Sequence, residues 1–197
     1  MTTDFGTLDR REAVKTLLAD RGDLLVVSGL GSASYDVFAA GEHPGNFYLW
    51  GAMGGAAMVG LGIALAQPTR PVAVITGDGE QLMGIGSLVT VATKKPGNLT
   101  IVVLDNGHFG ETGMQLSHSG LGARLEVIAQ GAGFPSISEI SDVEGLVRFR
   151  PEIQKVEGGP RLARVRIGSG HVERALPPRD GVFLKNRFRE NLRLPVT

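Results

Sequence analysis

Short apolar runs alternate along this chain with longer segments in which apolar residues recur at helical spacing. Most of these runs are continuous rather than alternating, which is typical of strands buried on both faces of a sheet. Strands are predicted at 23–28, 47–49, 71–76, 99–104 and 161–167. Helices are predicted at 8–21, 33–40, 51–66, 84–93, 125–131 and 142–149.

This order of elements predicts an α/β fold. Strands that alternate with helices form a doubly wound, mainly parallel sheet, and helices on both faces make three layers. Residues 1–170 contain no linker, repeat or low-complexity tract, so we expect one domain there. Residues 171–197 are rich in Pro and Arg and predict an extended basic tail that packs on the domain or on a partner subunit.

Composition excludes several kinds of chemistry. The 20 Lys and Arg residues balance 20 Asp and Glu residues, which argues against a nucleic-acid binder that works by bulk charge. The chain has no cysteine, so disulfides, zinc–thiolate sites, iron–sulfur clusters and thiol nucleophiles are excluded. No apolar leader is visible, and the uncharged stretch at 46–69 is too rich in glycine for a membrane span. We therefore expect a cytoplasmic protein with no membrane or nucleic-acid partner.

Two polar triplets, GDG at 77–79 and DNG at 105–107, each follow a strong apolar strand. A right-handed crossover makes these strands parallel, so both triplets should lie at the carboxyl edge of the sheet, where α/β folds bind ligands. Carboxylate and amide oxygens suit Mg2+, whose remaining ligands are commonly phosphate oxygens. Glycine-rich turns and helix N-termini attract those phosphates. Each triplet alone is common in turns, but the pair predicts a site for Mg2+ and a diphosphate.

The segment at 77–113 resembles the motif of thiamine-diphosphate enzymes, which begins with GDG and ends roughly thirty residues later with Asn-Asn or Asp-Asn. The resemblance implies the fold of that family. It also implies that Mg2+ is bound by the side chains of Asp78 and Asn106 and by the His108 carbonyl. Asp105 stands where Asn is commoner, which leaves the liganding Asn106 in place. Further cofactor contacts are implied for Gly77, Gly79, Glu80, Phe109 and Gly110.

The preceding segment, LWGAMGGAAMVGLGIALA at 49–66, agrees with this resemblance. In the family, the position of Gly51 offers a carbonyl to the 4′-amino group of the cofactor. The position of Met53 supplies the apolar wedge that keeps thiamine bent, and Ala52 lies between the two. An unbranched Met is a suitable filler beneath a ring, although simple core packing is the alternative for this residue.

The resemblance covers roughly residues 22–168 and is nearest to small, separate subunits of decarboxylases for sulfopyruvate and phosphonopyruvate. Such enzymes use a second domain that binds the pyrimidine and supplies a glutamate. This chain has room for only one domain. We therefore expect a diphosphate-binding subunit of a two-chain 2-oxo acid decarboxylase, with two copies of each chain. A carboligase resembling acetolactate synthase and an oxidoreductase subunit are alternatives with the same cofactor.

Glu111 and His118 are the candidate catalytic residues of this chain. Glu111 follows the metal-binding turn and could contact substrate, order its loop or be exposed. His118 lies in a segment expected to close over the site, where a histidine could move protons, although a solvated loop histidine is the alternative.

Two other classes of protein compete with this interpretation. The spacing Gly29-x-Gly31-x-x-Ser34 after a strand is close to a dinucleotide fingerprint but lacks its third glycine. A non-catalytic regulatory or assembly subunit could keep the fold without the chemistry, but the intact cofactor residues argue against it. The basic residues from 161 onward could meet an acidic partner, an anionic substrate or only solvent.

Overall fold

The computed structural model describes residues 5–196. Its main sheet has six parallel strands in the order β2-β1-β3-β4-β8-β7. The strands are β1 (Leu25–Ser28), β2 (Asn46–Tyr48), β3 (Val72–Gly77), β4 (Leu99–Asp105), β7 (Ser136–Ile140) and β8 (Arg161–Arg166). A separate hairpin pairs β5 (His108–Phe109) with β6 (Gln115–Leu116) in antiparallel fashion. The predicted parallel α/β fold is confirmed.

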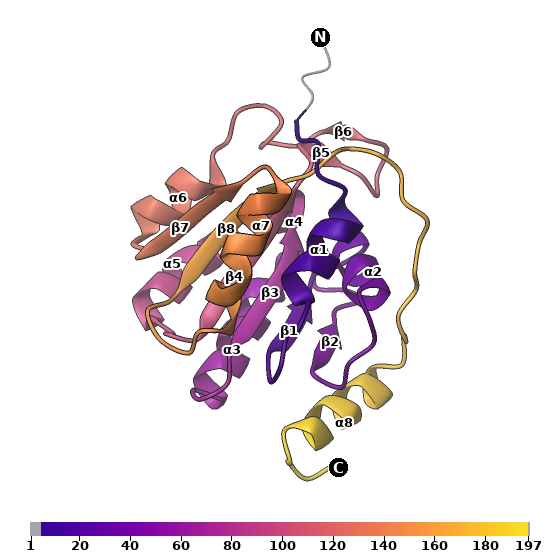
Figure 1. Ribbon diagram of the computed structural model, residues 1–197, viewed down its shortest axis with the longest axis vertical. Coiled ribbons are helices and arrows are strands. Elements are labelled where there is room, and N and C mark those ends of the chain that lie inside the picture. Colours follow the sequence, from indigo (N-terminus) through magenta and orange to yellow (C-terminus); the bar gives the residue numbers. More distant parts are fainter. Residues whose placement is uncertain (1–4, 197) are drawn as a thin grey trace.

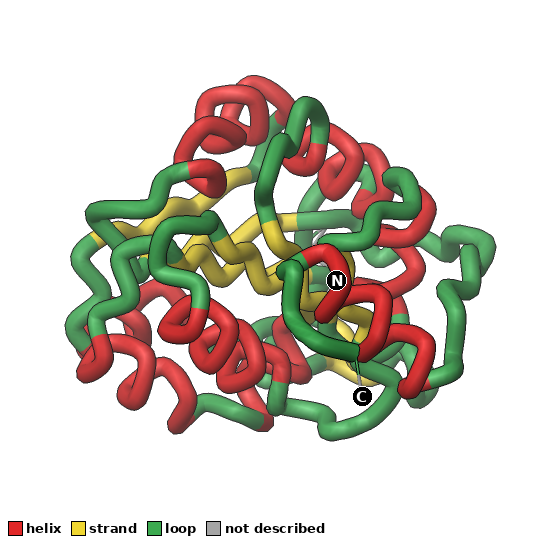
Figure 2. The backbone as a smooth tube through the Cα atoms, turned by 90° about the horizontal axis from the view of Figure 1, so that it is seen from below, coloured by secondary structure: helices red, strands yellow, loops and turns green. Residues whose placement is uncertain are grey.

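Helices cover both faces of the sheet, as Figures 1 and 2 show. They are α1 (Arg10–Leu18), α2 (Ser32–Ala39), α3 (Ala56–Ala66), α4 (Asp78–Met83), α5 (Gly86–Lys94), α6 (Leu125–Ala132), α7 (Val143–Phe149), the 3-10 helix η1 (Arg150–Gln154) and α8 (Gly181–Asn191). One core joins a face of the sheet to α1, α2 and α7, and the other core joins the opposite face to α3, α5 and α6. Ile75 and Ile101 are fully buried in different cores. Burial on two faces explains why the strand sequences are apolar without interruption.

The structure corrects three sequence predictions about local elements. The helix expected from residue 51 begins at Ala56, because Ala52 (φ 56°) and Gly54 (φ 86°) adopt left-handed backbone conformations. Asp78, expected in a turn, is the first residue of α4. Strand β7 was not predicted, because its sequence SISEI is short and half polar.

The C-terminal segment also differs from the extended tail that composition predicts. Residues 168–180 are indeed extended, but α8 follows, and the Asp180 carboxylate accepts the N–H groups of Val182 and Phe183 at its N-terminus. Leu184 and Phe188, one turn apart, are buried where α8 contacts β2. The segment therefore runs along the edge of the domain before its helix docks there (Figure 1).

No helix within residues 5–196 is long and apolar enough to cross a bilayer. The uncharged stretch at 46–69 forms β2 and the 11-residue α3.

Candidate functional site

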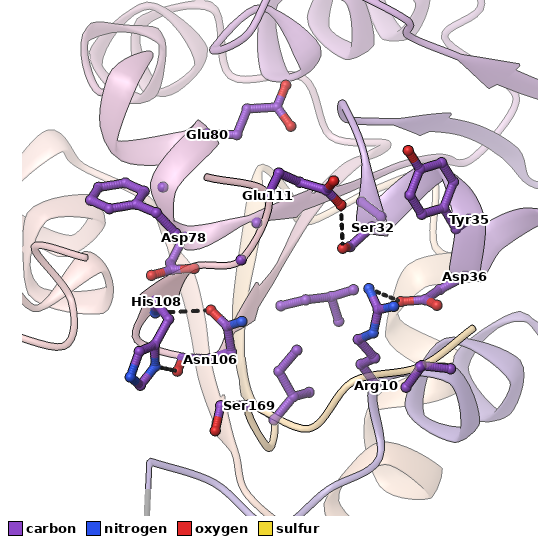
Figure 3. A pocket seen from close by; sticks show the side chains of 18 of the residues that line it. Arg10, Ser32, Tyr35, Asp36, Asp78, Glu80, Asn106, His108, Glu111 and Ser169 are labelled. Carbon is purple, nitrogen blue, oxygen red and sulfur yellow. Dashed lines mark hydrogen bonds and ion pairs between the residues drawn. The ribbon is translucent and has the colours of Figure 1, made fainter. Parts of the chain in front are cut away.

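A cavity of about 380 Å3 opens at the carboxyl ends of β1, β3 and β4. Strands β3 and β4 are adjacent and parallel, so the loops that carry GDG and DNG meet there as predicted. The lining also includes residues of α1, the turn after β1, and the extended segment that follows β8. Figure 3 shows Asp78, Asn106, Ser32 and Arg10 arranged around this cavity.

Asp78 and Asn106 form one corner of the cavity. Asp78 is 3% exposed, and its Oδ2 accepts a hydrogen bond from the Ser117 hydroxyl. Asn106 Oδ1 accepts the backbone N–H of His108 at 2.9 Å, and the His108 ring nitrogen Nδ1 lies 2.7 Å from the Asn106 carbonyl. These contacts fix the turn that carries Asn106 and the His108 carbonyl. Carboxylate and amide oxygens at one corner are a donor set that fits a hard divalent cation.

The electrostatics of this corner also suit a cation. Burial, followed by the nearby Asp105 carboxylate, raises the pKa of Asp78 to about 6. The Ser117 hydroxyl and backbone N–H groups oppose that shift by binding the charged form. A bound divalent cation would stabilise the ionised carboxylate of Asp78 further.

Glycines and helix N-termini line the neighbouring part of the cavity. A Cβ atom at Gly79 would lie 2.8 Å from the Phe109 ring, so the backbone there approaches the loop closely. Across the cavity, Gly31 (φ 72°) leads into α2, whose N-terminus has no side-chain cap. Uncapped N–H groups of this kind suit phosphate oxygens. Leu30 and Ser32 also line the cavity but were not predicted as site residues, although their turn follows β1 as GDG follows β3.

Glu80 borders the cavity, but its carboxylate holds neighbouring loops together. Oε2 accepts the Leu30 N–H at 3.1 Å and the Thr76 hydroxyl at 2.9 Å. A Cβ atom at Gly29 would collide with this oxygen, which explains the glycine there. Burial raises the pKa of Glu80. The contact of Glu80 with a diphosphate stays a prediction.

Met53 lines the cavity and is 45% exposed, which contradicts the alternative that it only fills the core. Gly51 and Ala52 belong to the same loop but do not line the cavity. Their cofactor contacts stay predictions.

The two candidate catalytic residues lie in different surroundings. Glu111 lines the cavity, accepts the Ser32 hydroxyl at 3.0 Å and pairs with Arg174 at 3.2 Å. His118 is exposed, and its ring lies edge-on to Phe109 with the ring centroids 6.1 Å apart. His118 does not line the cavity, so the geometry favours Glu111 as the residue closer to bound ligands.

A further wall of the cavity was not predicted at all. Arg10 and Arg11 of α1 face the fully buried carboxylate of Asp36, at 3.3 and 3.5 Å. Burial raises the pKa of Asp36 to about 6, while the two arginines oppose the shift. His171 and Arg174 complete this wall from the extended C-terminal segment. No local pattern marks these residues, because the fold alone brings them together.

Several basic residues of the C-terminal third are engaged within the chain. Arg161 and Arg164 are buried, Arg179 stacks 4.9 Å above the Trp50 ring, and Arg187 pairs with Glu42 at 3.0 Å. These contacts rule out a purely solvated face for this part of the sequence. They leave Arg174 as the arginine of this segment that lines the cavity.

Residues 31–157 match the family described as "Thiamine pyrophosphate enzyme, C-terminal TPP binding domain", and the chain belongs to that family. This confirms the resemblance seen in the sequence and supports thiamine diphosphate as the cofactor. Sulfopyruvate decarboxylase subunit beta of Methanothermobacter thermautotrophicus is 33% identical over 190 residues, which cover 94% of this chain and 96% of that one. Phosphonopyruvate decarboxylase of Streptomyces viridochromogenes is 38% identical over 165 residues, which cover 83% of this chain and 41% of that one.

A solved structure has the same fold. It is a putative thiamin diphosphate-dependent enzyme from Mycobacterium smegmatis, with a TM-score of 0.67 and 23% identity. The match covers 83% of this chain and 32% of that one.

Proposed function

We propose that this chain is the diphosphate-binding subunit of a thiamine-diphosphate-dependent 2-oxo acid decarboxylase. The observation that carries the proposal is the meeting of Asp78, Asn106 and the glycine turns in one cavity at the β3–β4 edge. The names of the relatives support decarboxylation as the reaction. Their shared substrate chemistry, a 2-oxo acid with a second anionic group, is the substrate class that we propose.

Each part of the site has a role in this proposal. Asp78, Asn106 and the His108 carbonyl hold Mg2+, and the backbone around Gly79 and the N-terminus of α2 bind the diphosphate. Met53, which lines the cavity, would support the apolar part of the cofactor. When bound, thiamine diphosphate supplies the electron sink that decarboxylation needs. The protein contributes binding, orientation and a cavity that is partly shielded from water.

Glu111 has two possible roles toward the substrate in this framework. Its carboxylate lies at the cavity between Ser32 and Arg174, within reach of a ligand that enters between them. It can hold or move a proton there, or it can only keep the loop closed. The paired variants described in the Discussion separate these roles.

A second chain is part of the proposal. The name of the Methanothermobacter relative, a subunit beta, supports a hetero-oligomer. In our proposal the complex is cytoplasmic, and the partner chain supplies the pyrimidine-side glutamate. Exposed methionines support an interface near the cavity: Met53, which lines it, is 45% exposed, and Met83 at the end of α4 is 67% exposed. Gly54 and Gly84 touch backbone to backbone, which places the loop of Met53 beside the end of α4. Exposed methionines of this kind are common at protein interfaces.

Native mass spectrometry of the tagged chain, purified from its own source with Mg2+, tests this function. We expect a complex with a second chain type that carries the mass of thiamine diphosphate, and we expect it to release CO2 from sulfopyruvate or phosphonopyruvate. A homo-oligomer that binds no cofactor when thiamine diphosphate is in excess would contradict the proposal. That result would favour a regulatory subunit.

A further inference from the structure

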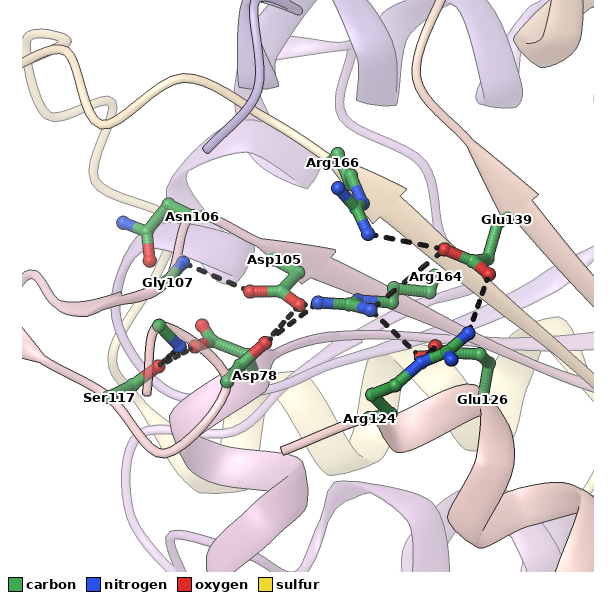
Figure 4. A network of polar contacts seen from close by, with 12 residues as sticks. Asp78, Asp105, Asn106, Gly107, Ser117, Arg124, Glu126, Glu139, Arg164 and Arg166 are labelled. Carbon is green, nitrogen blue, oxygen red and sulfur yellow. Dashed lines mark hydrogen bonds and ion pairs between the residues drawn. The ribbon is translucent and has the colours of Figure 1, made fainter. Parts of the chain in front are cut away.

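A buried ion-pair network lies directly behind the metal corner. Arg164 of β8 is 3% exposed, and its Nε lies 2.7 Å from Asp105 Oδ2. Its Nη1 lies 2.9 Å from Glu126 Oε2, and its Nη2 donates to the Ser119 hydroxyl at 3.1 Å. Figure 4 shows the guanidinium of Arg164 between Asp105 and the acids of α6 and β7. A single arginine therefore joins β8, β4 and α6.

Asp105, which is held by Arg164, in turn contacts the loop that carries the proposed metal ligands. Its Oδ1 accepts the Gly107 N–H at 3.0 Å, and its Oδ2 accepts the Ser119 hydroxyl at 2.5 Å. The Gly107 carbonyl accepts the Ser117 N–H at 2.8 Å, and the Ser117 hydroxyl donates to Asp78. A continuous series of hydrogen bonds thus connects Arg164 to Asp78 and to the turn of Asn106.

Arg164 supplies the positive charge that balances the buried carboxylate of Asp105. Asp78 and Asp105 are both buried at the same edge of the sheet, where Asp78 follows β3 and Asp105 ends the adjacent β4. Arg164 is the cation that contacts Asp105, whereas Glu126 also pairs with Arg124 at 2.6 Å. Loss of Arg164 would leave the buried carboxylate of Asp105 with neutral hydrogen-bond donors only and without a cationic partner beside Asp78, which is costly in a medium of low polarity.

We propose that Arg164 is a positioning residue for the metal site: through Asp105 it holds the loop of Asn106 and, through Ser117, the carboxylate of Asp78. The inference rests on the proposed function, because it assumes that Asp78 and Asn106 bind a divalent cation. It explains why this chain carries Asp105 where the family commonly has Asn: the extra negative charge is matched by an arginine on the neighbouring strand.

Arg161 provides a matched control on the same strand. It is 2% exposed and lies at the opposite end of β8, where it donates to the Gly97 carbonyl at 3.1 Å and lies 3.6 Å from Glu152. Its replacement also removes a buried arginine from β8. Its contacts do not lead to the metal corner.

The test measures Mn2+ binding to the full chain, together with any partner that co-purifies, by electron paramagnetic resonance in the presence of thiamine diphosphate. We expect Arg164→Met to raise the Kd for Mn2+ at least about tenfold, as is usual for groups that orient metal ligands. Arg161→Met should change that Kd by less than about twofold, even if it lowers the melting temperature as much. The double variant Asp105→Asn, Arg164→Met removes both charges and should bind Mn2+ more tightly than Arg164→Met.

Equal Mn2+ affinity of Arg164→Met and the wild type, or equal losses in Arg164→Met and Arg161→Met, would overturn this inference alone. Absence of Mn2+ binding by the wild-type protein would overturn the proposed metal site and this inference with it. If Arg164→Met does not fold, Arg164→Lys and the double variant replace it. Both should bind Mn2+ more weakly than the wild type, with Arg164→Lys the less affected, and wild-type affinity in both would overturn the inference.

Discussion

Two walls of the cavity are built in different ways. The metal wall consists of residues 77–79 and 105–108, which follow two central strands and are held by buried contacts such as the pair of Asp105 with Arg164. The strap wall consists of Arg10, Ser32, Glu111, residues 169–172 and Arg174. Its ion pair joins Glu111 and Arg174, whose side chains are 42% and 62% exposed. Buried, fully bonded groups are rigid, whereas exposed ion pairs contribute little and exchange readily. The comparison indicates that the metal wall sets the chemistry and that the strap wall can adapt to the ligand.

The largest effect is expected when the metal wall loses a ligand. Asp78→Ala removes the carboxylate that we assign to Mg2+, so metal affinity and decarboxylation should fall by more than the roughly 10–100-fold typical of residues behind the ligands. Calorimetric titration with Mg2+ and thiamine diphosphate, and CO2 release by the purified complex, measure both. Glu144→Gln, which changes an exposed acid of α7 outside the cavity, is the control. Normal activity in Asp78→Ala would favour a regulatory subunit.

The extended segment of the strap wall leads into α8, so the packing of α8 on the domain should hold that segment in place. Phe188 is 5% exposed and packs edge-on against Phe47 with the ring centroids 5.4 Å apart, so Phe188→Ala should lower the free energy of unfolding by about 3–5 kcal/mol. Phe183→Ala on the same helix removes a side chain that is 48% exposed and should cost less than about 1 kcal/mol. Urea denaturation of both variants measures the difference. Equal costs would mean that α8 is not anchored as described.

Asp36, which pairs with Arg10 of the strap wall, makes the stability of the folded protein depend on pH. Its pKa is about 6 in the folded protein, against 3.8 as the ordinary value, because burial outweighs the attraction of Arg10 and Arg11, and the Asp9 carboxylate adds to the rise. The folded state therefore binds this proton more tightly. The stabilisation is complete below about pH 4 and is lost as the pH rises through about 6.

This pH dependence is tested by measuring the free energy of unfolding at pH 4.5 and pH 7.5 for the wild type and for Asp36→Asn. The wild type should lose on the order of 2 kcal/mol more than the variant between these values. Other titrating groups are shared by both proteins, so the difference isolates Asp36. Identical pH dependence would show that the carboxylate is ionised throughout the range.

The smallest effect on stability is expected at the exposed pair of the strap wall. Arg174→Gln and Glu111→Gln should each change the free energy of unfolding by less than about 1 kcal/mol. The activities of these two variants show whether Glu111 has a role in the reaction. If Glu111 moves a proton of the substrate, Glu111→Gln should lower kcat about 100-fold or more, whereas Arg174→Gln should mainly raise KM. Equal, mild losses in both variants would leave Glu111 with a role only in closing the loop.

The metal wall could be predicted from the sequence because each of its residues lies next to an apolar strand that is recognisable in the sequence. Asp78 and Asn106 each follow an apolar strand, and the handedness of the crossover between the strands brings them to the same edge. Ser32 could have been found by the same reasoning, because its turn follows β1. Arg10 and Arg174 could not, because only the complete fold brings α1 and the C-terminal segment to one cavity. Helix α8 escaped prediction because Pro and Arg dominate the composition around its two buried side chains.

The proposed function requires that Asp78, Asn106 and the His108 carbonyl hold a divalent cation together with a diphosphate. Crystals of the protein grown with Mn2+ and thiamine diphosphate test it most directly, because anomalous scattering locates manganese without reference to the surrounding chain. We predict one manganese peak at the β3–β4 edge, bonded to these three oxygens and to the diphosphate. A diphosphate bound elsewhere, or a manganese peak away from Asp78 and Asn106, would contradict the proposed metal and diphosphate site.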